Sequence, residues 1–290
     1  MPTYKSERLF LFINSMCILG ISLTMLLPMF HLLSVSLSSS QYISLNEVFL
    51  LPKGFNLNAY EYIASQNRIW RSMGVSIYIT VVGTLVSLLI TTTMSYALSR
   101  SYMPARSLIL KLVLITFIFS IPLIPFFLVV RDFGFLNSLW SLIIPAASGA
   151  YYVIIMKTFF QGLSAELFDA GRIDGCNEFV MFARIAVPMS IPVIATIGLF
   201  HAVYQWNSYF YAIIFIRDSS LYPIQMLVRE IVILENLQSN LSNFGSMNEL
   251  TLPDQIKSSV ILFATLPILI VYPFIQKYFV KGAMLGSIKE

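Results

Sequence analysis

The stretch LSAELFDAGRIDGCNEFVMFARIAVPMSIP, residues 163–192, decides the fold of this chain. It is a polar segment with long apolar runs on both sides, and it carries basic residues, four carboxylates and two glycines. A membrane protein that keeps such a segment in the cytosol commonly uses it to contact a partner. The function therefore depends on what passes through the apolar runs and on what binds this segment.

The composition is that of an integral membrane protein. Of the 290 residues, 57% are hydrophobic and 11% are charged, and the mean hydropathy is +0.79. Soluble domains contain about 25% charged residues. The net charge is only +4 and the basic residues form no stripe, so we expect no nucleic-acid partner. Cys17 and Cys176 are not placed for a disulfide, and we expect both to behave as small apolar residues.

Six charge-free runs are each long enough to cross a membrane as a helix, which takes about 20 apolar residues. These runs lie between the charged residues Arg8 and Glu47, Arg71 and Arg100, Lys111 and Arg131, Asp132 and Lys157, Arg184 and Arg217, and Lys257 and Lys277. The spans expected from them cover residues 9–33, 72–99, 108–131, 137–160, 187–216 and 257–280. The short segments of alternating polarity that mark a membrane β-barrel are not seen. The first run is too long for the core of a signal peptide, and no small-residue cleavage site follows it. We therefore predict an all-α integral membrane protein, a single transmembrane domain over residues 1–290 with six transmembrane helices.

The distribution of Lys and Arg predicts the orientation of the spans. With the N-terminus inside, eleven Lys and Arg residues lie on the cytosolic side and seven lie outside; the opposite orientation reverses these numbers. The sharpest local signal is the short loop at residues 99–111, which carries three basic residues. We therefore expect cytosolic N- and C-termini, a cytosolic loop at 162–188, and outer loops at 34–71 and 217–256.

Two short helices around a glycine are predicted within the loop at 162–188. Ser164 is a suitable N-cap for the first helix, and Glu166 and Asp169 lie in its first turns, where the helix dipole favours negative charge. Gly175 is expected to end this helix, and a second helix is expected to begin near Asn177.

Apolar residues recur at helical spacing in both short helices. In the first they are Leu163, Leu167 and Ala170, with Phe168 beside them, and in the second they are Phe179, Phe182 and Ile185. These residues can pack on the membrane ends of the same chain or on a partner. Periodicity alone does not decide between the two.

Residues 165–192 resemble the cytoplasmic signature, called the EAA loop, of binding-protein-dependent ABC importer permeases, and the match has no gaps. Asp169, Ala170 and Gly171 stand where the family has Glu-Ala-Ala, and Asp174 with Gly175 matches its Asp-Gly. Its ending is matched by Phe182, Ile185, Pro188 and Pro192. Two residues depart from the pattern: Asp169 keeps the charge on a shorter arm, and Gly171 loosens the helix. We expect docking to be retained, while the coupling contact can differ in detail.

Further stretches resemble the carbohydrate members of that family. The sequence WNSYF at 206–210 is similar to the Trp-Asn element in the fifth span of carbohydrate permeases. The sequences at 221–231 and 272–289 are similar to the LplC-like branch of the maltose-permease-G type. The resemblance covers nearly the whole chain and is weakest before Tyr60.

The resemblance implies a type I ABC importer fold in the bacterial plasma (inner) membrane. The chain would be one of two permease subunits in a heterodimer, and two copies of a cytosolic ATPase would bind its loop. An extracellular or periplasmic solute-binding protein would deliver an oligosaccharide. The coupling residues that it implies are Glu166, Asp169, Ala170, Gly171, Asp174, Gly175 and Pro188. The chain has no Walker-type phosphate loop, so we expect no enzyme activity and no cofactor on it, with ATP and Mg bound by the ATPase subunits.

The fifth span carries the residues expected to line the sugar pathway, which are Tyr204, Trp206, Asn207 and Tyr209. Aromatic faces stack on sugar rings, and amide groups form hydrogen bonds with sugar hydroxyls. Burying an amide within a membrane span costs free energy unless the amide has a binding role. An aromatic belt at the outer interface is the alternative, and it is favoured for Tyr209 and Tyr211, whereas the pathway is favoured for Trp206 and Asn207. For His201 in this span and for His31 we expect hydrogen-bonded structural roles. Seven basic and eight acidic residues in the outer segments give no selection for an acidic sugar.

Other classes of protein fit the sequence less well. An ion-coupled secondary carrier should place ionisable residues within its spans, whereas the six runs are free of Asp, Glu, Lys and Arg. A membrane enzyme should show a clustered acid, base or metal site, whereas the clustered carboxylates of the 162–188 loop have no suitable array of His or Cys ligands. An ABC permease for a solute other than a sugar stays open as an alternative.

Overall fold

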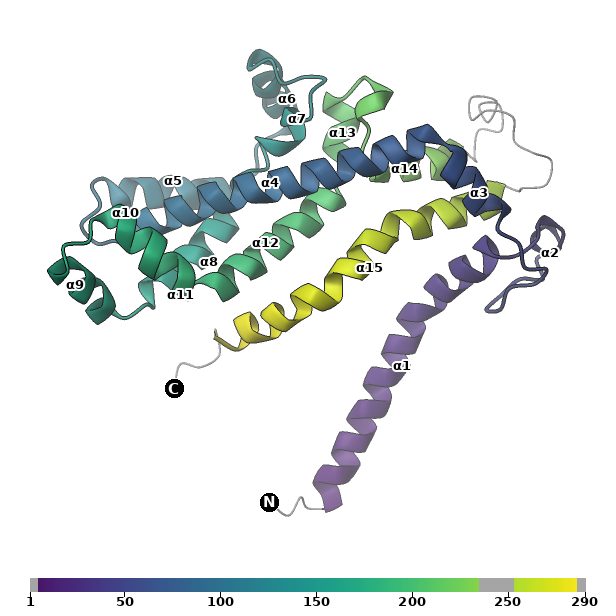
Figure 1. Cartoon of the computed structure of the whole chain (residues 1–290), viewed down its shortest axis with the longest axis horizontal. Helices are drawn as coiled ribbons and strands as arrows, with labels where there is room; N and C mark the ends of the chain where they lie inside the picture. The colour runs from purple at the N-terminus through teal and green to yellow at the C-terminus, as the bar shows by residue number, and fades with distance from the viewer. Residues whose placement is uncertain (1–4, 235–252, 286–290) are drawn as a thin grey trace. The chain divides into compact units, whose positions relative to one another are not determined.

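The computed structural model describes residues 5–234 and 253–285, and within them it describes the side chains of residues 7–233 and 253–273. Every regular element in these ranges is a helix, so the all-α prediction is confirmed for the described part of the chain. Figure 1 shows the order of the elements along the chain.

The first eight helices are α1 (Lys5–Ser36), α2 (Ser40–Ser44), α3 (Asn58–Ser65), α4 (Asn67–Ser99), α5 (Arg106–Ile118), α6 (Leu123–Asp132), α7 (Trp140–Ile143) and α8 (Ala150–Gln161). The loop at 162–188 then contains α9 (Ala165–Ile173), α10 (Glu178–Met181) and the π-helix η1 (Phe182–Ala186), and it runs into α11 (Val187–Met189). The remaining elements are α12 (Ile191–Trp206), α13 (Phe210–Phe215), the 3₁₀-helix η2 (Ser219–Leu221), α14 (Ile224–Leu234) and α15 (Pro253–Leu285).

The chain divides into two compact units, of which the first comprises residues 1–70 and 228–266. Its longest helix, α1, buries none of its apolar window against the rest of the protein. Polar contacts stabilise the remainder of this unit: Arg68 pairs with Glu230, and the amide of Gln255 donates to Oδ1 of Asn56 at 2.7 Å. His31 has the expected hydrogen-bonded role, because its Nδ1 donates to the carbonyl of Phe49 at 2.8 Å.

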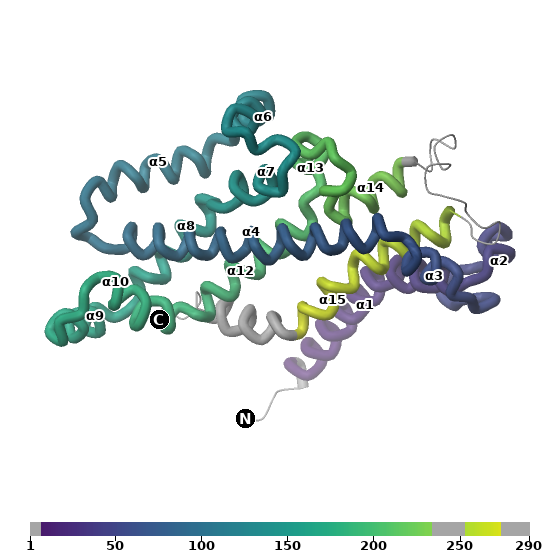
Figure 2. Tube along the Cα trace, turned by 45° about the horizontal axis from the view of Figure 1, so that its top comes forward, coloured from purple at the N-terminus to yellow at the C-terminus, as the bar shows by residue number. Residues whose placement is uncertain are grey.

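The second unit comprises residues 71–227 and 267–290 and contains the loop at 162–188. Figure 2 shows that α9 and α10 lie at the end of this unit where the connection from α4 to α5 also lies. The packing there is one cluster of buried side chains contributed by α4, α8, α9, α10, η1 and α12. Its members are Tyr96, Met156, Phe160, Phe168, Met181, Ala186, Val193 and Ile197. The loop is therefore built into the core of this unit.

Three helices in the described ranges are long and apolar enough to cross a membrane: α1 over Glu7–Ser36, α4, and α15 over Pro253–Pro273. A fourth candidate is the pair of helical stretches Glu178–Met189 and Ile191–Trp206, which meet at 78°. The chain thus has several helices able to span a membrane, and the count of six spans stays a prediction.

Three of the expected spans are each divided by a break in the helix. The run at 108–131 breaks between α5 and α6 at Pro122, and the run at 137–160 breaks between α7 and α8, where Pro145 follows the end of α7. Proline removes a backbone donor and disfavours helical geometry in the preceding residue. The run at 187–216 breaks after Trp206, at Asn207 and Ser208.

Polar side chains of α12 bridge the break between α7 and α8. Nε2 of His201 donates to the carbonyl of Ala146 at 3.0 Å, and the amide of Gln205 donates to the carbonyl of Leu142 at 3.2 Å. Both side chains are buried, and Gly83 leaves the space for Gln205, since a Cβ there would lie 2.5 Å from its Nε2. Carbonyls freed by a broken helix in a membrane protein need such partners. The structural role expected for His201 is therefore confirmed.

Candidate functional site

The two short helices of the 162–188 loop form through local backbone chemistry. Gly175 adopts a left-handed φ of +77° just after α9, and its N–H donates to the carbonyl of Arg172 at 3.0 Å. The N–H of Cys176 donates to the carbonyl of Gly171 at 2.9 Å, which completes a Schellman motif. Oδ1 of Asn177 then accepts the N–H of Val180 at 2.9 Å and caps α10. The predicted pair of helices around Gly175 is confirmed.

The apolar residues of the loop divide between two surfaces. The inner surface consists of Phe168, Gly171 and Met181, which are buried against the rest of the second unit. Phe168 is 3% exposed, and Gly171 lies on the same face of α9 because the two residues are three positions apart. A Cβ on Gly171 would lie 3.1 Å from Cδ1 of Ile185, so this glycine allows α9 to approach η1 closely. The loop therefore packs on its own chain, but through only part of its apolar residues.

The outer surface of the loop points away from the protein. It consists of Glu166, Leu167, Asp169, Ala170, Ile173 and Asp174, all of which are exposed. Ile173 is 87% exposed, and Phe179 on α10 is also largely exposed, at 74%. The sequence interpretation missed Ile173. It lies five residues after Phe168, which places it on the opposite side of α9 from that buried ring.

Charges on the loop interact weakly with one another. Nη1 of Arg172 lies 3.1 Å from Oδ1 of Asp169, and its Nη2 lies 3.8 Å from Oε1 of Glu178. These side chains are exposed, so solvent screens the ion pairs and they contribute little to stability. A hydrogen bond with Tyr102 and the nearby carboxylates raise the pKa of Arg172, so its charge is retained throughout the physiological range. Asp169 stays exposed and accessible to a basic group on a partner.

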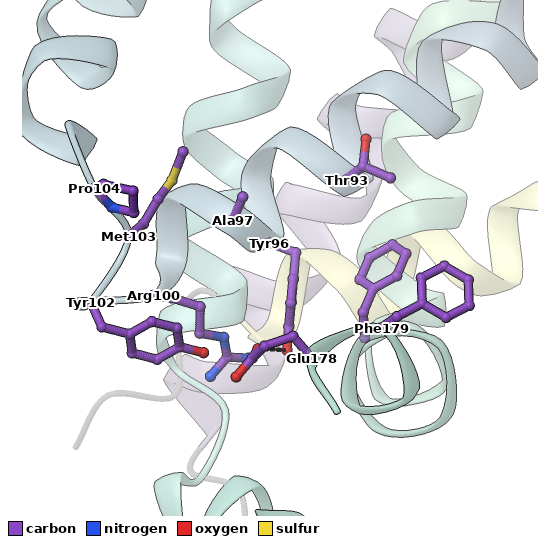
Figure 3. Close-up of a pocket in the computed structure, with 10 residues that line it drawn as sticks. Thr93, Tyr96, Ala97, Arg100, Tyr102, Met103, Pro104, Glu178 and Phe179 are labelled. Atoms are coloured by element: carbon purple, nitrogen blue, oxygen red, sulfur yellow. Dashed lines mark hydrogen bonds between the residues drawn. The ribbon is translucent and has the colours of Figure 1, made fainter. Parts of the chain in front are cut away.

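The end of α4 contacts both helices of the loop, and Figure 3 shows its contact with Glu178 of α10. The hydroxyl of Tyr96 donates to Oε2 of Glu178, the first residue of α10, at 3.0 Å. The guanidinium carbon of Arg100 lies 3.7 Å from the ring centroid of Phe168 and 4.4 Å from that of Tyr96. Beside these contacts is a pocket of about 420 Å³, lined by residues of α4, α10, η1 and the connection from α4 to α5, among them Tyr102. Burial raises the pKa of Tyr102, and its hydrogen bond to Glu178 adds to the effect.

The chain leaves the loop through a bent segment. The π-helix η1 continues into α11, which contains the exposed Pro188, and the direction changes by 78° at Ser190 before α12 begins. Pro188 and Pro192 flank this bend, and neither can donate a backbone hydrogen bond across it. π-Helical turns within helices occur frequently at functional sites.

The residues expected to line a sugar pathway differ in their surroundings. Tyr204 and Tyr209 are 46% and 44% exposed, whereas Trp206 is only 5% exposed. Trp206 lines an apolar pocket of about 190 Å³ together with residues of α4, α12 and α15. Asn207 is exposed, but its amide donates to the carbonyl of Val203 at 2.8 Å, within the last turn of α12. The structure therefore leaves the two tyrosines available to a ligand and gives Trp206 and Asn207 local structural contacts.

Comparison with known proteins gives consistent matches. Residues 100–284 match the family described as "Binding-protein-dependent transport system inner membrane component". The chain is 43% identical to Protein LplC of Bacillus subtilis (strain 168) over 290 residues, which are 100% of this chain and 98% of the relative. It is 44% identical to the polygalacturonan/rhamnogalacturonan transport system permease protein YtcP of the same organism over 274 residues, which are 94% of this chain and 95% of the relative.

A solved structure has the same fold as this chain. It is described as the crystal structure of a bacterial ABC transporter involved in the import of the acidic polysaccharide alginate. The TM-score is 0.89 at 30% sequence identity, and the match covers 96% of this chain and 100% of the chain in that structure.

Proposed function

Because the chain belongs to the family of binding-protein-dependent transport system inner membrane components, we propose that it is a permease subunit of an ATP-driven importer for oligosaccharides. Members of this family are inner membrane transport components and not enzymes. The observation that carries the proposal is the identity of 43–44% along almost the whole chain with LplC and with YtcP, a polygalacturonan/rhamnogalacturonan transport system permease protein. The match to a chain of an alginate importer supports the same class of solute.

The outer surface of the loop is the proposed binding surface for a cytosolic ATPase subunit. Leu167, Ala170 and Ile173 follow one another at three-residue spacing and form an exposed apolar stripe at the centre of this surface. The exposed carboxylates of Glu166, Asp169 and Asp174 lie beside this stripe as an acidic rim. Interfaces commonly place apolar anchors at the centre and charged groups at the rim, where the charges guide association. The complementary partner is a cleft with an apolar floor and basic residues at its edge. The Schellman turn at Gly175, the close packing at Gly171 and the bend after Pro188 hold the surface in place.

The remaining parts of the proposed assembly follow from this role. We place the loop in the cytosol, in an arrangement of six spans with both termini inside. Eleven of the Lys and Arg residues then lie on the cytosolic side and seven lie outside. A second permease subunit would complete a heterodimer, two ATPase subunits would bind ATP and Mg, and a solute-binding protein outside the membrane would deliver the sugar. Closure of the ATPases would move the loop, and helices packed on it would follow as a rigid body.

The class of sugar is proposed from the relatives. The polymers named for two of them, polygalacturonan and alginate, consist of sugars that carry carboxylates. We therefore propose oligosaccharides that contain uronic acids as the substrate of this importer. Nearly equal numbers of acidic and basic residues in the outer segments mean that selection by charge would have to come from the binding protein or the second permease subunit.

Reconstitution tests the proposed function directly. The chain is co-expressed with a second permease, an ATPase and a binding protein encoded beside it, and the complex is placed in liposomes. Uptake of oligogalacturonides and ATP hydrolysis stimulated by the loaded binding protein are measured, with neutral malto-oligosaccharides as the comparison. We expect ATP-dependent uptake of the charged sugar. Uptake driven by an ion gradient without ATP would contradict the proposal of an ATP-driven importer. Preference for the neutral sugar would contradict only the proposed uronic-acid substrate and would leave the importer function standing.

Replacement of Tyr204 with alanine tests the sugar pathway. We expect the substrate concentration for half-maximal uptake to rise by roughly tenfold, because the loss of one aromatic contact costs about 1 kcal/mol or slightly more. ATPase binding should be unchanged. Tyr151→Ala is the control, because Tyr151 is a similarly exposed tyrosine on α8 that has no proposed place on the pathway. Equal uptake by the two variants would return Tyr204 to the aromatic belt.

A further inference from the structure

Arg100 connects the end of α4 with the first helix of the loop. It follows the last residue of α4, and its guanidinium lies near the rings of both Tyr96 on α4 and Phe168 on α9. Both ring centroids are within the range of a cation–π interaction, which is about 6 Å. Nε and Nη2 of Arg100 are shielded from solvent, and neither has a hydrogen-bond acceptor among the described residues. The faces of the Tyr96 and Phe168 rings therefore stabilise this part of the guanidinium group.

The same turn of α4 also contacts the second helix of the loop. Tyr96 lies four residues before Arg100, so the two side chains share one face of the helix. The hydroxyl of Tyr96 donates to Glu178 at 3.0 Å, and its ring packs against Phe160 and Phe182 with centroid distances of 5.8 and 5.0 Å. One face of α4 thus contacts α9 through Phe168 and α10 through Glu178. Figure 3 shows Arg100, Tyr96 and Glu178 close together at this point.

These contacts are independent of the covalent connections of the loop. The loop is joined directly in the chain to α8 and, through α11, to α12, so a movement of the loop reaches those two helices in any case. It reaches α4 only through side chains. Arginine is suited to such a contact because its planar guanidinium can stack on aromatic faces.

We propose that Arg100 is a positioning residue that fixes the loop to the end of α4, so that movement of the loop is passed to α4 during transport. The inference rests on the proposed function, since it assumes that ATPase subunits move the loop. It concerns a different surface from the one that binds them. Loss of Arg100 should therefore leave the ATPases bound and active while less sugar is carried for each ATP hydrolysed.

The test uses the complete importer in liposomes and compares Arg100→Gln with the parent. We expect ATP hydrolysis to stay within about twofold of the parent and the amount of sugar taken up per ATP to fall by about fivefold or more. Arg100→Lys should recover part of this ratio, because an ammonium group can still approach the rings. Lys111→Gln is the matched control, since it removes one exposed positive charge near the start of α5.

A second variant tests whether Phe168 is the partner through which Arg100 acts. Phe168→Leu removes the ring and retains an apolar side chain. If the two residues act through one contact, the double variant Arg100→Gln/Phe168→Leu should have the same uptake per ATP as the more severe single variant. If the fall in uptake per ATP in the double variant equals the product of the two single falls, the residues act independently and the proposal is overturned.

Thiol labelling gives a readout that does not depend on transport. Cys176 is partly buried beside the inner surface of the loop, and Cys17→Ser leaves it as the only thiol of this chain. Labelling of Cys176 by a water-soluble maleimide is followed on this chain by mass spectrometry in the purified complex. We expect Arg100→Gln to increase the rate by about threefold or more, because the loop separates from α4 more often.

Besides multiplying effects in the double variant, three results would overturn the proposal: unchanged uptake per ATP in Arg100→Gln, a parallel fall of hydrolysis and uptake, or unchanged labelling of Cys176. Each of these results counts against the proposal only if the ATPases co-purify with the parent complex. Failure of the parent to bind any ATPase would instead contradict the proposed function, so the two failures are distinguishable.

Discussion

Importers that carry Ile173→Asp are expected to lose ATPase binding, and their sugar uptake should fall by about a hundredfold. Ile173 is 87% exposed in the subunit, so a carboxylate there changes the stability of the chain by at most about 0.5 kcal/mol. The same carboxylate at the apolar centre of the proposed interface would be desolvated without a partner. Such a change costs roughly 3 kcal/mol of binding free energy, which corresponds to about a hundredfold in affinity.

Two measurements separate the effect on binding from an effect on folding. The affinity of the ATPase subunit for the purified permease pair is measured by titration, and the amount of permease in the membrane is measured by immunoblot. Ile173→Leu is the matched control, because it keeps an apolar side chain of the same size and should retain nearly the parent affinity. If Ile173→Asp binds the ATPase as tightly as the parent, the outer surface of the loop is not the docking surface.

The local structure of the loop could be predicted because short-range chemistry determines it. Ser164 and Asn177 directly precede α9 and α10, and Gly175 follows the end of α9 after Asp174. Only Asn177 caps its helix through the side chain, since Ser164 makes no such hydrogen bond. The inward and outward faces could not be predicted from the same residues. Phe168 and Leu167 are adjacent and both apolar, and only the packing against Tyr96, Met181 and the rest of the cluster selects Phe168 for burial.

The breaks in the expected spans show a different limit of sequence interpretation. A charge-free run indicates an apolar environment, but it carries no information on whether the backbone continues as one helix. Pro122 and Pro145 are visible in the sequence, yet proline within a span can also kink a helix without ending it. The decisive contacts are distant in sequence, as with His201 and Gln205, which donate to carbonyls more than fifty residues earlier in the chain.

Replacement of Gly171 with leucine is expected to abolish uptake, because the larger side chain would clash with residues packed against the inner surface of the loop. A Cβ on Gly171 would already lie 3.1 Å from Cδ1 of Ile185 and 3.6 Å from Cγ of Met181. The three further carbon atoms of leucine do not fit between α9 and these side chains. Overpacking of this kind typically costs about 1–3 kcal/mol, and α9 can avoid the cost by moving away from η1, which would displace the outer surface from its partner.

Alanine at the same position separates the size of the side chain from the conformational freedom of glycine. The end of the Ile185 side chain can move by a few tenths of an ångström, and Gly171 is at a position where the EAA pattern has alanine, so Gly171→Ala should retain most of the parent uptake. It should also raise helix propensity, since glycine in a helix costs about 1 kcal/mol relative to alanine. Uptake and ATPase affinity are measured for both variants in the reconstituted importer. Equal activity of the leucine and alanine variants would show that close packing between α9 and η1 is not needed for coupling, whereas loss of activity in both would show that Gly171 acts through its backbone.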